Sequence, residues 1–166
     1  MINKINKLSQ SEFIKVFANI FENSSWIALE LYKEKPFNNF ENLSTKMLGI
    51  FDKITKEKQL KILKAHPDLA DKTKIDSLTS SSKKEQSNAG LDQCSKEEFI
   101  EFRNLNIKYK KKFGFPFIYA VKGKTKKEIL SNFRQRVSCD INVEFEEAKK
   151  QVKKIANLRL NEINKK

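Results

Sequence analysis

Glycine and proline, the residues that most often interrupt regular secondary structure, are scarce in this chain. It has four glycines and three prolines among 166 residues, so few positions break its periodic segments. Within those segments apolar residues return every three or four positions, which is the spacing of one face of an α-helix. We therefore predict an all-α fold, a single-domain bundle over residues 1–166 with about seven to nine helices.

Helix starts are marked by capping boxes, in which a Ser or Thr and a Glu three residues later bond each other's backbone amides. The pattern occurs at Ser9–Glu12, Ser82–Glu85, Ser95–Glu98 and Thr125–Glu128. Further helices are expected over 25–32, 43–54, 55–66 and from 140 or 141 to about 163. The Ser-rich residues 71–84 predict a loop, and the aromatic and β-branched residues around Pro116 predict one extended segment near 114–122.

The formal net charge of +13 fits two classes of protein. One class binds nucleic acid or an anionic membrane surface. The other takes an anionic small substrate, in a chain whose lysines and asparagines reflect a proteome bias. The lysines are scattered along every segment rather than gathered in one arm, so we expect a small anionic substrate and no nucleic-acid partner. A helical adaptor protein would need an exposed apolar stripe, and the pattern leaves none over.

The cysteines and the termini exclude other classes. Cys94 and Cys139 lack the spacing of a zinc site, and one histidine cannot build a His-rich one. We predict that both thiols are reduced and half-buried, and that no metal is bound. No apolar run approaches the roughly 20 residues of a membrane span, and the first ten residues lack the apolar core of a signal peptide. We therefore expect a cytoplasmic protein with no membrane partner.

His66 is the only histidine in the chain, and two interpretations fit it. Imidazole is the side chain best suited to donate or accept a proton near neutral pH. A histidine at the end of a helix is also stabilised by the helix dipole without any catalytic role. Pro67 disfavours a helical conformation at His66 and fixes the chain direction just beyond the ring.

Arg159 falls on the apolar face of the last helix, seven residues after Val152. A guanidinium on a buried face needs an anionic partner. That partner is either an internal carboxylate or a group of the substrate, and the spacing leaves both open. The helix can also be rotated, with Ala156, Leu160 and Ile163 inward instead.

Two further stretches have both a structural and a functional interpretation. Glu85 is the third residue of the helix expected to start at Ser82, where its side chain would satisfy a backbone amide. The same helix start would offer N–H groups to an anion, with Ser82, Glu85 and Gln86 adding polar groups. Residues 115–121 are either a buried hydrophobic strand or an extended backbone whose polar groups face a ligand.

Five motifs lie along the chain in an order that spans nearly its whole length. They are FANIFENSSWIALELYKEKPF, AHPDLA, SKKEQSNAGL, KKFGFPFIYAVKG and IANLRL. Taken together they resemble the 2-oxo-4-hydroxy-4-carboxy-5-ureidoimidazoline (OHCU) decarboxylase family of urate degradation. Any one motif is a weak signal, whereas five in this order across one domain-length chain are specific.

The resemblance implies an all-α carboxy-lyase that converts OHCU to (S)-allantoin without a cofactor, usually as a homodimer. It implies that His66 is catalytic, and we predict that His66 donates the proton and that Glu85 assists it. The substrate supplies its own electron sink, because the carboxylate-bearing carbon adjoins a C=N bond. The substrate-binding residues implied by the resemblance are Pro67, Ser82, Gln86, Phe117, Ile118, Tyr119, Ala120, Val121 and Arg159.

Overall fold

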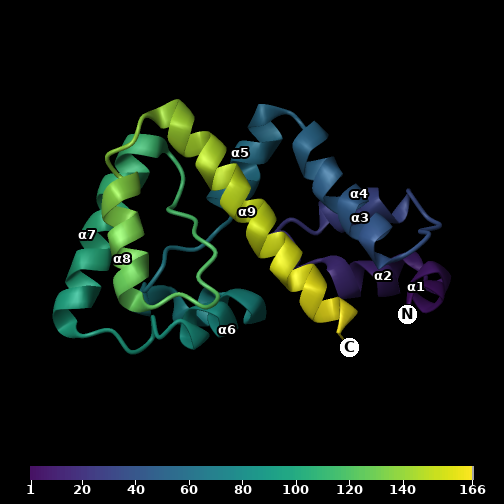
Figure 1. Cartoon of the computed structure of the whole chain (residues 1–166), viewed down its shortest axis with the longest axis horizontal. Coiled ribbons are helices and arrows are strands. Elements are labelled where there is room, and N and C mark those ends of the chain that lie inside the picture. Colours follow the sequence, from purple (N-terminus) through teal and green to yellow (C-terminus); the bar gives the residue numbers. More distant parts are fainter. Residues whose placement is uncertain (166) are drawn as a thin grey trace. The chain divides into compact units, whose positions relative to one another are not determined.

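The computed structural model describes residues 1–165 and is all-α, as predicted (Figure 1). Those residues form nine α-helices and one short 3-10 helix, with no strand among them. They divide into two compact units: unit 1 is residues 1–65 together with the chain from Lys153 on, and unit 2 is residues 66–152. No helix of the described chain has the length and apolarity needed to cross a bilayer. The single-domain boundary stays a prediction.

Unit 1 is built from the N-terminal helices and the second half of the last one. Its helices are α1 (Ile2–Lys7), α2 (Gln10–Phe17), α3 (Trp26–Tyr32), α4 (Phe40–Lys53), α5 (Lys56–Lys64) and the C-terminal half of α9 (Ile141–Asn164). Helix α3 packs against both α2 and α4. The rings of Phe21 and Phe51 stack at a centroid distance of 5.3 Å, and both are buried. Each such ring contributes about 1.5–3 kcal/mol by leaving water.

Unit 2 holds the middle of the chain. Its elements are η1 (Lys72–Ser77), α6 (Ser80–Asn88), α7 (Lys96–Phe113), α8 (Lys126–Arg136) and the N-terminal half of α9. Helices α7 and α8 lie side by side (Figure 1). Their shared core is aromatic: the Phe117 and Phe133 rings stack at 3.8 Å, and Tyr109 meets both rings edge-on.

Three of the four predicted capping boxes are confirmed, at the starts of α2, α7 and α8. The fourth is wrong, because α6 begins at Ser80 with Thr79 as its N-cap, and the Thr79 side chain accepts from the Ser82 amide. Thr79 is as suitable a cap as Ser82, and the earlier start adds a helical turn through the serine run. The loop predicted over 71–84 therefore contains η1 and the start of α6. Helix α1 was not predicted, and Ile141, the first residue of α9, is exposed.

The extended segment predicted near 114–122 is confirmed. Gly114 ends α7 in the left-handed conformation with φ +78°, which glycine adopts without a Cβ clash. The chain then runs without helix or strand to the turn at Lys122 and Gly123. This segment connects α7 to α8. Its rings Phe115 and Phe117 contact Tyr109 of α7 and Phe133 of α8, respectively.

Candidate active site

His66 lies just beyond the end of α5 and is the first residue of unit 2. Helix α5 ends at Lys64 with Ala65 as its C-cap, so the predicted stop before Pro67 is confirmed. His66 as a whole residue is only 9% exposed. A buried imidazole is shielded from bulk water, which is the setting that a directed proton transfer needs.

Helix α6 presents three of the predicted site residues on one side. Ser82 and Gln86 are four residues apart and both buried, while Glu85 is half-buried. Since Thr79 is the N-cap, Glu85 lies in the second turn and is not the third residue of the helix. The interpretation of Glu85 as the partner in a capping box is therefore wrong, and its predicted role toward the substrate is left standing.

The side chain of Gln86 bonds the backbone that follows His66. Its Nε2 donates to the Asp68 carbonyl at 3.3 Å, and its Oε1 accepts from the Ala70 amide at 3.0 Å. Helix α6 is thereby tied to residues 68–70. A glutamine amide has further donor and acceptor capacity, so the predicted contact of Gln86 with substrate stays a prediction.

Residues 117–121 hold their apolar side chains inward. Phe117, Ile118 and Val121 are buried, and Tyr119 and Ala120 are half-buried. Two polar groups of this backbone bond buried side chains: the Ile118 carbonyl accepts from Arg136 Nη1 at 2.6 Å, and the Ala120 amide donates to Gln151 Oε1 at 3.1 Å. The interpretation as a buried hydrophobic strand is wrong as to the strand, because none forms within residues 1–165, although most of the apolar side chains are buried.

Tyr109, Arg136 and Glu144 form a buried polar network that bonds the extended segment at the Ile118 carbonyl. The carboxylate oxygen Oε1 of Glu144 accepts from the Tyr109 hydroxyl and from Arg136 Nε and Nη2. The Arg136 guanidinium also lies over the Phe117 ring, 4.6 Å from its centroid. Burial, the hydrogen bond to Glu144 and the charge of that carboxylate all raise the pKa of Tyr109, so the phenol remains a neutral donor.

Arg159 belongs to unit 1. The ten other predicted site residues all belong to unit 2. It is 6% exposed. Its Nη2 pairs with Glu22 Oε2 at 3.0 Å and its Nη1 donates to the Asn19 carbonyl at 2.8 Å. An internal carboxylate is therefore one partner of this guanidinium. Ala156 and Leu160 are buried beside it, so both rotations considered for the helix hold in part.

Unit 2 also contains a cavity of about 390 Å³. Its walls come from η1, α6 and the start of α7, and its apolar lining includes Ile75, Leu78, Leu91 and Phe99. Of the predicted site residues only Gln86 lines it. The cavity therefore borders α6 without including His66, Ser82 or Glu85.

Cys94 and Cys139 are both free and half-buried, as predicted. Burial, together with the charge of Glu98, raises the pKa of the Cys94 thiol to about 11, so the thiolate is scarce at neutral pH. Within residues 1–165 no three His, Cys, Asp or Glu side chains gather as a metal site would require.

The sequence patterns missed four buried polar residues that support the site. They are Asn106, Arg136, Glu144 and Gln151. Of the four, only Asn106 interrupts a regular apolar stripe, that of α7. Nothing in the sequence around Arg136 and Glu144 distinguishes them from charged residues on a helix surface, and their contact forms only when the helices pack.

Comparison with known proteins covers nearly the whole chain. The family model for OHCU decarboxylase matches residues 6–161. The uric acid degradation bifunctional protein of Bacillus sp. (strain TB-90) is 41% identical over 98% of the chain, which spans 32% of that protein. The 2-oxo-4-hydroxy-4-carboxy-5-ureidoimidazoline decarboxylase of Haloferax volcanii is 35% identical over 97% of the chain, which covers 94% of its length.

A solved structure agrees with these matches. The crystal structure of OHCU decarboxylase in the presence of (S)-allantoin superposes with a TM-score of 0.73 and 26% identity, covering 89% of this chain and 96% of that one. The chain thus aligns with proteins of its own length as well as with about a third of the bifunctional protein. By its match from residue 6 to residue 161, this chain belongs to the OHCU decarboxylase family.

Proposed function

We propose that this protein decarboxylates OHCU to (S)-allantoin in urate degradation. The observation that carries the proposal is the burial of His66, the chain's only imidazole, in the same unit as Ser82, Gln86 and residues 117–121. The family match and the relatives named for the same reaction support it.

The chemistry asks for positioning and one proton. As the bond to the carboxylate breaks, CO₂ leaves and its electron pair enters the adjoining C=N system of the substrate. A proton then reaches the ring carbon that becomes the stereocentre. The hydroxyl at the neighbouring carbon becomes a carbonyl, and its proton passes to the ring nitrogen that took up the electron pair. One proton is consumed for each CO₂ released. A general acid fixed on one face of the ring provides that proton and sets the configuration.

We assign the proton to His66. Pro67 fixes the chain direction just beyond His66, and burial keeps His66 from bulk water. A placed general acid contributes about 10²–10⁴-fold to the rate. Glu85 accepts hydrogen bonds from the ureido or ring N–H groups and assists His66.

The remaining predicted residues hold the substrate in the proposal. Ser82, Gln86 and Arg159 bond its oxygen atoms, and the backbone of residues 117–121 bonds its polar edge. In the proposal a substrate carboxylate binds the Arg159 guanidinium, which has five N–H donors and also bonds Glu22 and Asn19. Holding the reacting groups in place supplies several kcal/mol of barrier lowering by itself.

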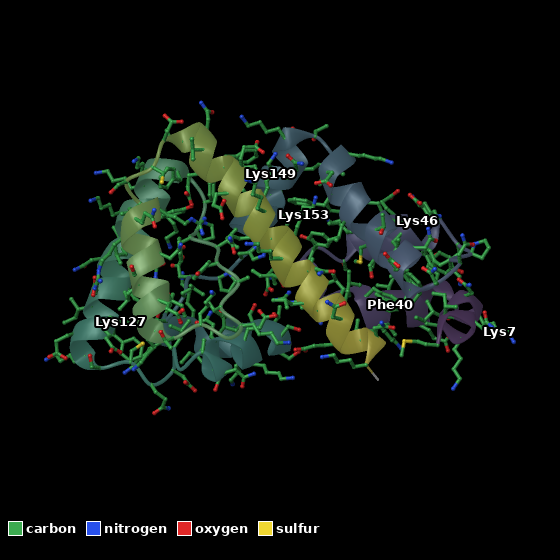
Figure 2. The ribbon with its side chains drawn as sticks, viewed as in Figure 1. Lys7, Phe40, Lys46, Lys127, Lys149 and Lys153 are labelled. Carbon is green, nitrogen blue, oxygen red and sulfur yellow. The ribbon has the colours of Figure 1, made fainter. Side chains whose placement is uncertain are left out.

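The excess positive charge has a kinetic role in the proposal. The lysines labelled in Figure 2 come from four helices, α1, α4, α8 and α9. In the proposal the net charge of +13 attracts the small anionic substrate and raises its association rate. We further propose that the protein acts in the cytoplasm and that it is a homodimer. Sedimentation of the untagged protein tests the oligomeric state.

The assignment of the reaction is tested with unstable substrate made in place. Urate oxidase and hydroxyisourate hydrolase generate OHCU from urate, and circular dichroism follows the appearance of (S)-allantoin. Addition of this protein is expected to accelerate that signal in proportion to its concentration. Decay of OHCU at the spontaneous rate, with racemic product, would remove the proposal.

A further inference from the structure

The five residues from His66 to Ala70, here called the histidine segment, are held by side chains of α6 and α7. Gln86 of α6 bonds the Asp68 carbonyl and the Ala70 amide. Asn106 Nδ2 of α7 donates to the Leu69 carbonyl at 3.0 Å, and Lys110 Nζ, one turn further along α7, donates to Asp68 Oδ2 at 2.5 Å. Every residue of the segment after Pro67 therefore has a fixed polar anchor.

The segment ends in a strained conformation. Ala70 has φ +55°, a region that residues with a Cβ seldom occupy. Such a conformation persists only where the surrounding contacts impose it. Here the contact is the bond from the Ala70 amide to Gln86 Oε1. The backbone path from His66 to Ala70 is thus set by its anchors and not by its own preference.

Asn106 is a costly choice for packing alone. It lies 4% exposed in the core stripe of α7 between Phe102 and Tyr109. Its Oδ1 is buried and has no hydrogen-bond partner among residues 1–165. An unsatisfied buried acceptor costs about 1–3 kcal/mol, so a leucine would suit this position better if it served only the core. What the asparagine adds is the bond to the Leu69 carbonyl.

The Asp68–Lys110 pair likewise holds the histidine segment in place more than it adds stability. The Asp68 side chain is 9% exposed and that of Lys110 is 40% exposed. A pair that is half open to water adds little stability. It does fix the Asp68 side chain against α7, and with it the residue two positions after His66.

We infer that Asn106 and the Asp68–Lys110 ion pair are positioning residues for His66, acting through the histidine segment. The inference rests on the proposed function, in which the place of the imidazole over the substrate sets rate and configuration. A catalytic group displaced by about 1 Å can lose about 100-fold in rate. Loss of an anchor is therefore expected to lower kcat and stereoselectivity more than substrate affinity.

Four variants separate this role from a purely structural one. Asn106→Leu removes the anchor at Leu69, and Lys110→Met removes the anchor at Asp68. Lys110→Arg keeps a cation for Asp68. Lys111→Met is the matched control, because it removes the same charge from an exposed position on the same helix. Lys110 is partly exposed, so we expect its variants to fold even if Asn106→Leu does not.

The first readout is spectroscopic and needs no substrate. In the untagged protein His66 is the only source of imidazole signals, so one set of ring resonances reports its surroundings directly. We expect Lys110→Met and Asn106→Leu to shift or broaden these resonances, and Lys110→Arg and Lys111→Met to leave them in place. Unchanged ring resonances in both anchor variants would overturn the inference, whatever the protein's reaction.

The second readout is kinetic. We expect Lys110→Met to lower kcat about tenfold or more with KM within about twofold, and to lower the enantiomeric excess of (S)-allantoin. Lys110→Arg should recover most of the loss, and Lys111→Met should match wild type. Full activity and selectivity in Lys110→Met would also overturn the inference while leaving the reaction assigned. A wild-type protein that does not accelerate OHCU decay would instead remove the proposed function.

Discussion

Arg159 and Glu22, 137 positions apart in the sequence, form a buried ion pair with 3.0 Å between Nη2 and Oε2. Their side chains are 6% and 1% exposed. The pair belongs to unit 1 and explains how a guanidinium is tolerated on the apolar face of α9. It also means that Arg159 has a structural partner beside any substrate that it binds, so its two roles need separate tests.

Replacement of Arg159 is predicted to affect stability and activity by different routes. Arg159→Met leaves Glu22 buried without this guanidinium, and breaking a buried pair from one side costs about 3–5 kcal/mol. Adding Glu22→Gln removes the stranded charge and should restore most of the stability. Urea unfolding of the single and double variants measures this recovery.

If Arg159 also binds substrate, activity should not recover together with stability in the double variant. In the stable double variant KM for OHCU should remain raised, since the bond to a substrate oxygen is still missing. If the double variant regains both stability and a wild-type KM, Arg159 serves only the fold.

The Tyr109–Glu144 bond predicts a stability loss at alkaline pH. The folded-state pKa of Tyr109 is raised, by burial first and then by Glu144, above the value of about 10 for an unfolded tyrosine. The bond's contribution is thus complete below about pH 10 and is lost as pH rises further, because only the unfolded chain releases the proton readily.

Tyr109→Phe is the matched control for that titration. Between about pH 9 and pH 11, the free energy of unfolding of wild type should fall more steeply than that of Tyr109→Phe. Lysine titration is common to both proteins, so the difference isolates the phenol. Parallel curves would show that the Tyr109 pKa is the same in the folded and unfolded states.

The start of α6 at Thr79 predicts which hydroxyl stabilises that helix. Thr79→Ala removes the N-cap and should destabilise α6 by about 1 kcal/mol, seen as faster amide exchange across Ser80–Asn88. Ser82→Ala lies inside the helix and should not produce that capping loss. The opposite ranking would restore the helix start at Ser82 that the sequence pattern indicated.

The sequence could predict those parts of the fold that local patterns determine. Ser9, Ser95 and Thr125 each precede a glutamate by three residues, and each opens a helix. The same pattern failed at Ser82 because Thr79 competes for the cap and four consecutive residues there can start a helix. Local preference alone cannot choose between two adequate caps.

The candidate site divides in the same way. His66 and Pro67 stand out locally, as the only imidazole and the proline that ends a helix. Asn106 and Arg136, by contrast, matter because they bond the backbone carbonyls of Leu69 and Ile118, which lie 37 and 18 positions away in the sequence. Such contacts depend on how the helices pack, and that information is spread over the whole core.

Steering by the net charge predicts a salt-dependent rate. The value of kcat/KM should fall several-fold between about 0.01 M and 0.3 M NaCl, because added ions screen the attraction between the lysines and an anionic substrate. The spontaneous decay of OHCU at each ionic strength is the control. A rate constant that does not vary with salt would assign the +13 charge to composition alone.

The role of His66 is tested most directly by the stereochemical course of the reaction with and without its imidazole. OHCU generated in place is mixed with excess wild type or His66→Gln, and circular dichroism follows a single turnover. We predict (S)-allantoin from wild type, and from His66→Gln a rate lower by about 10²–10⁴-fold with loss of configuration. Equal rates and equal (S) selectivity in the two proteins would contradict the assignment of His66 as the proton donor.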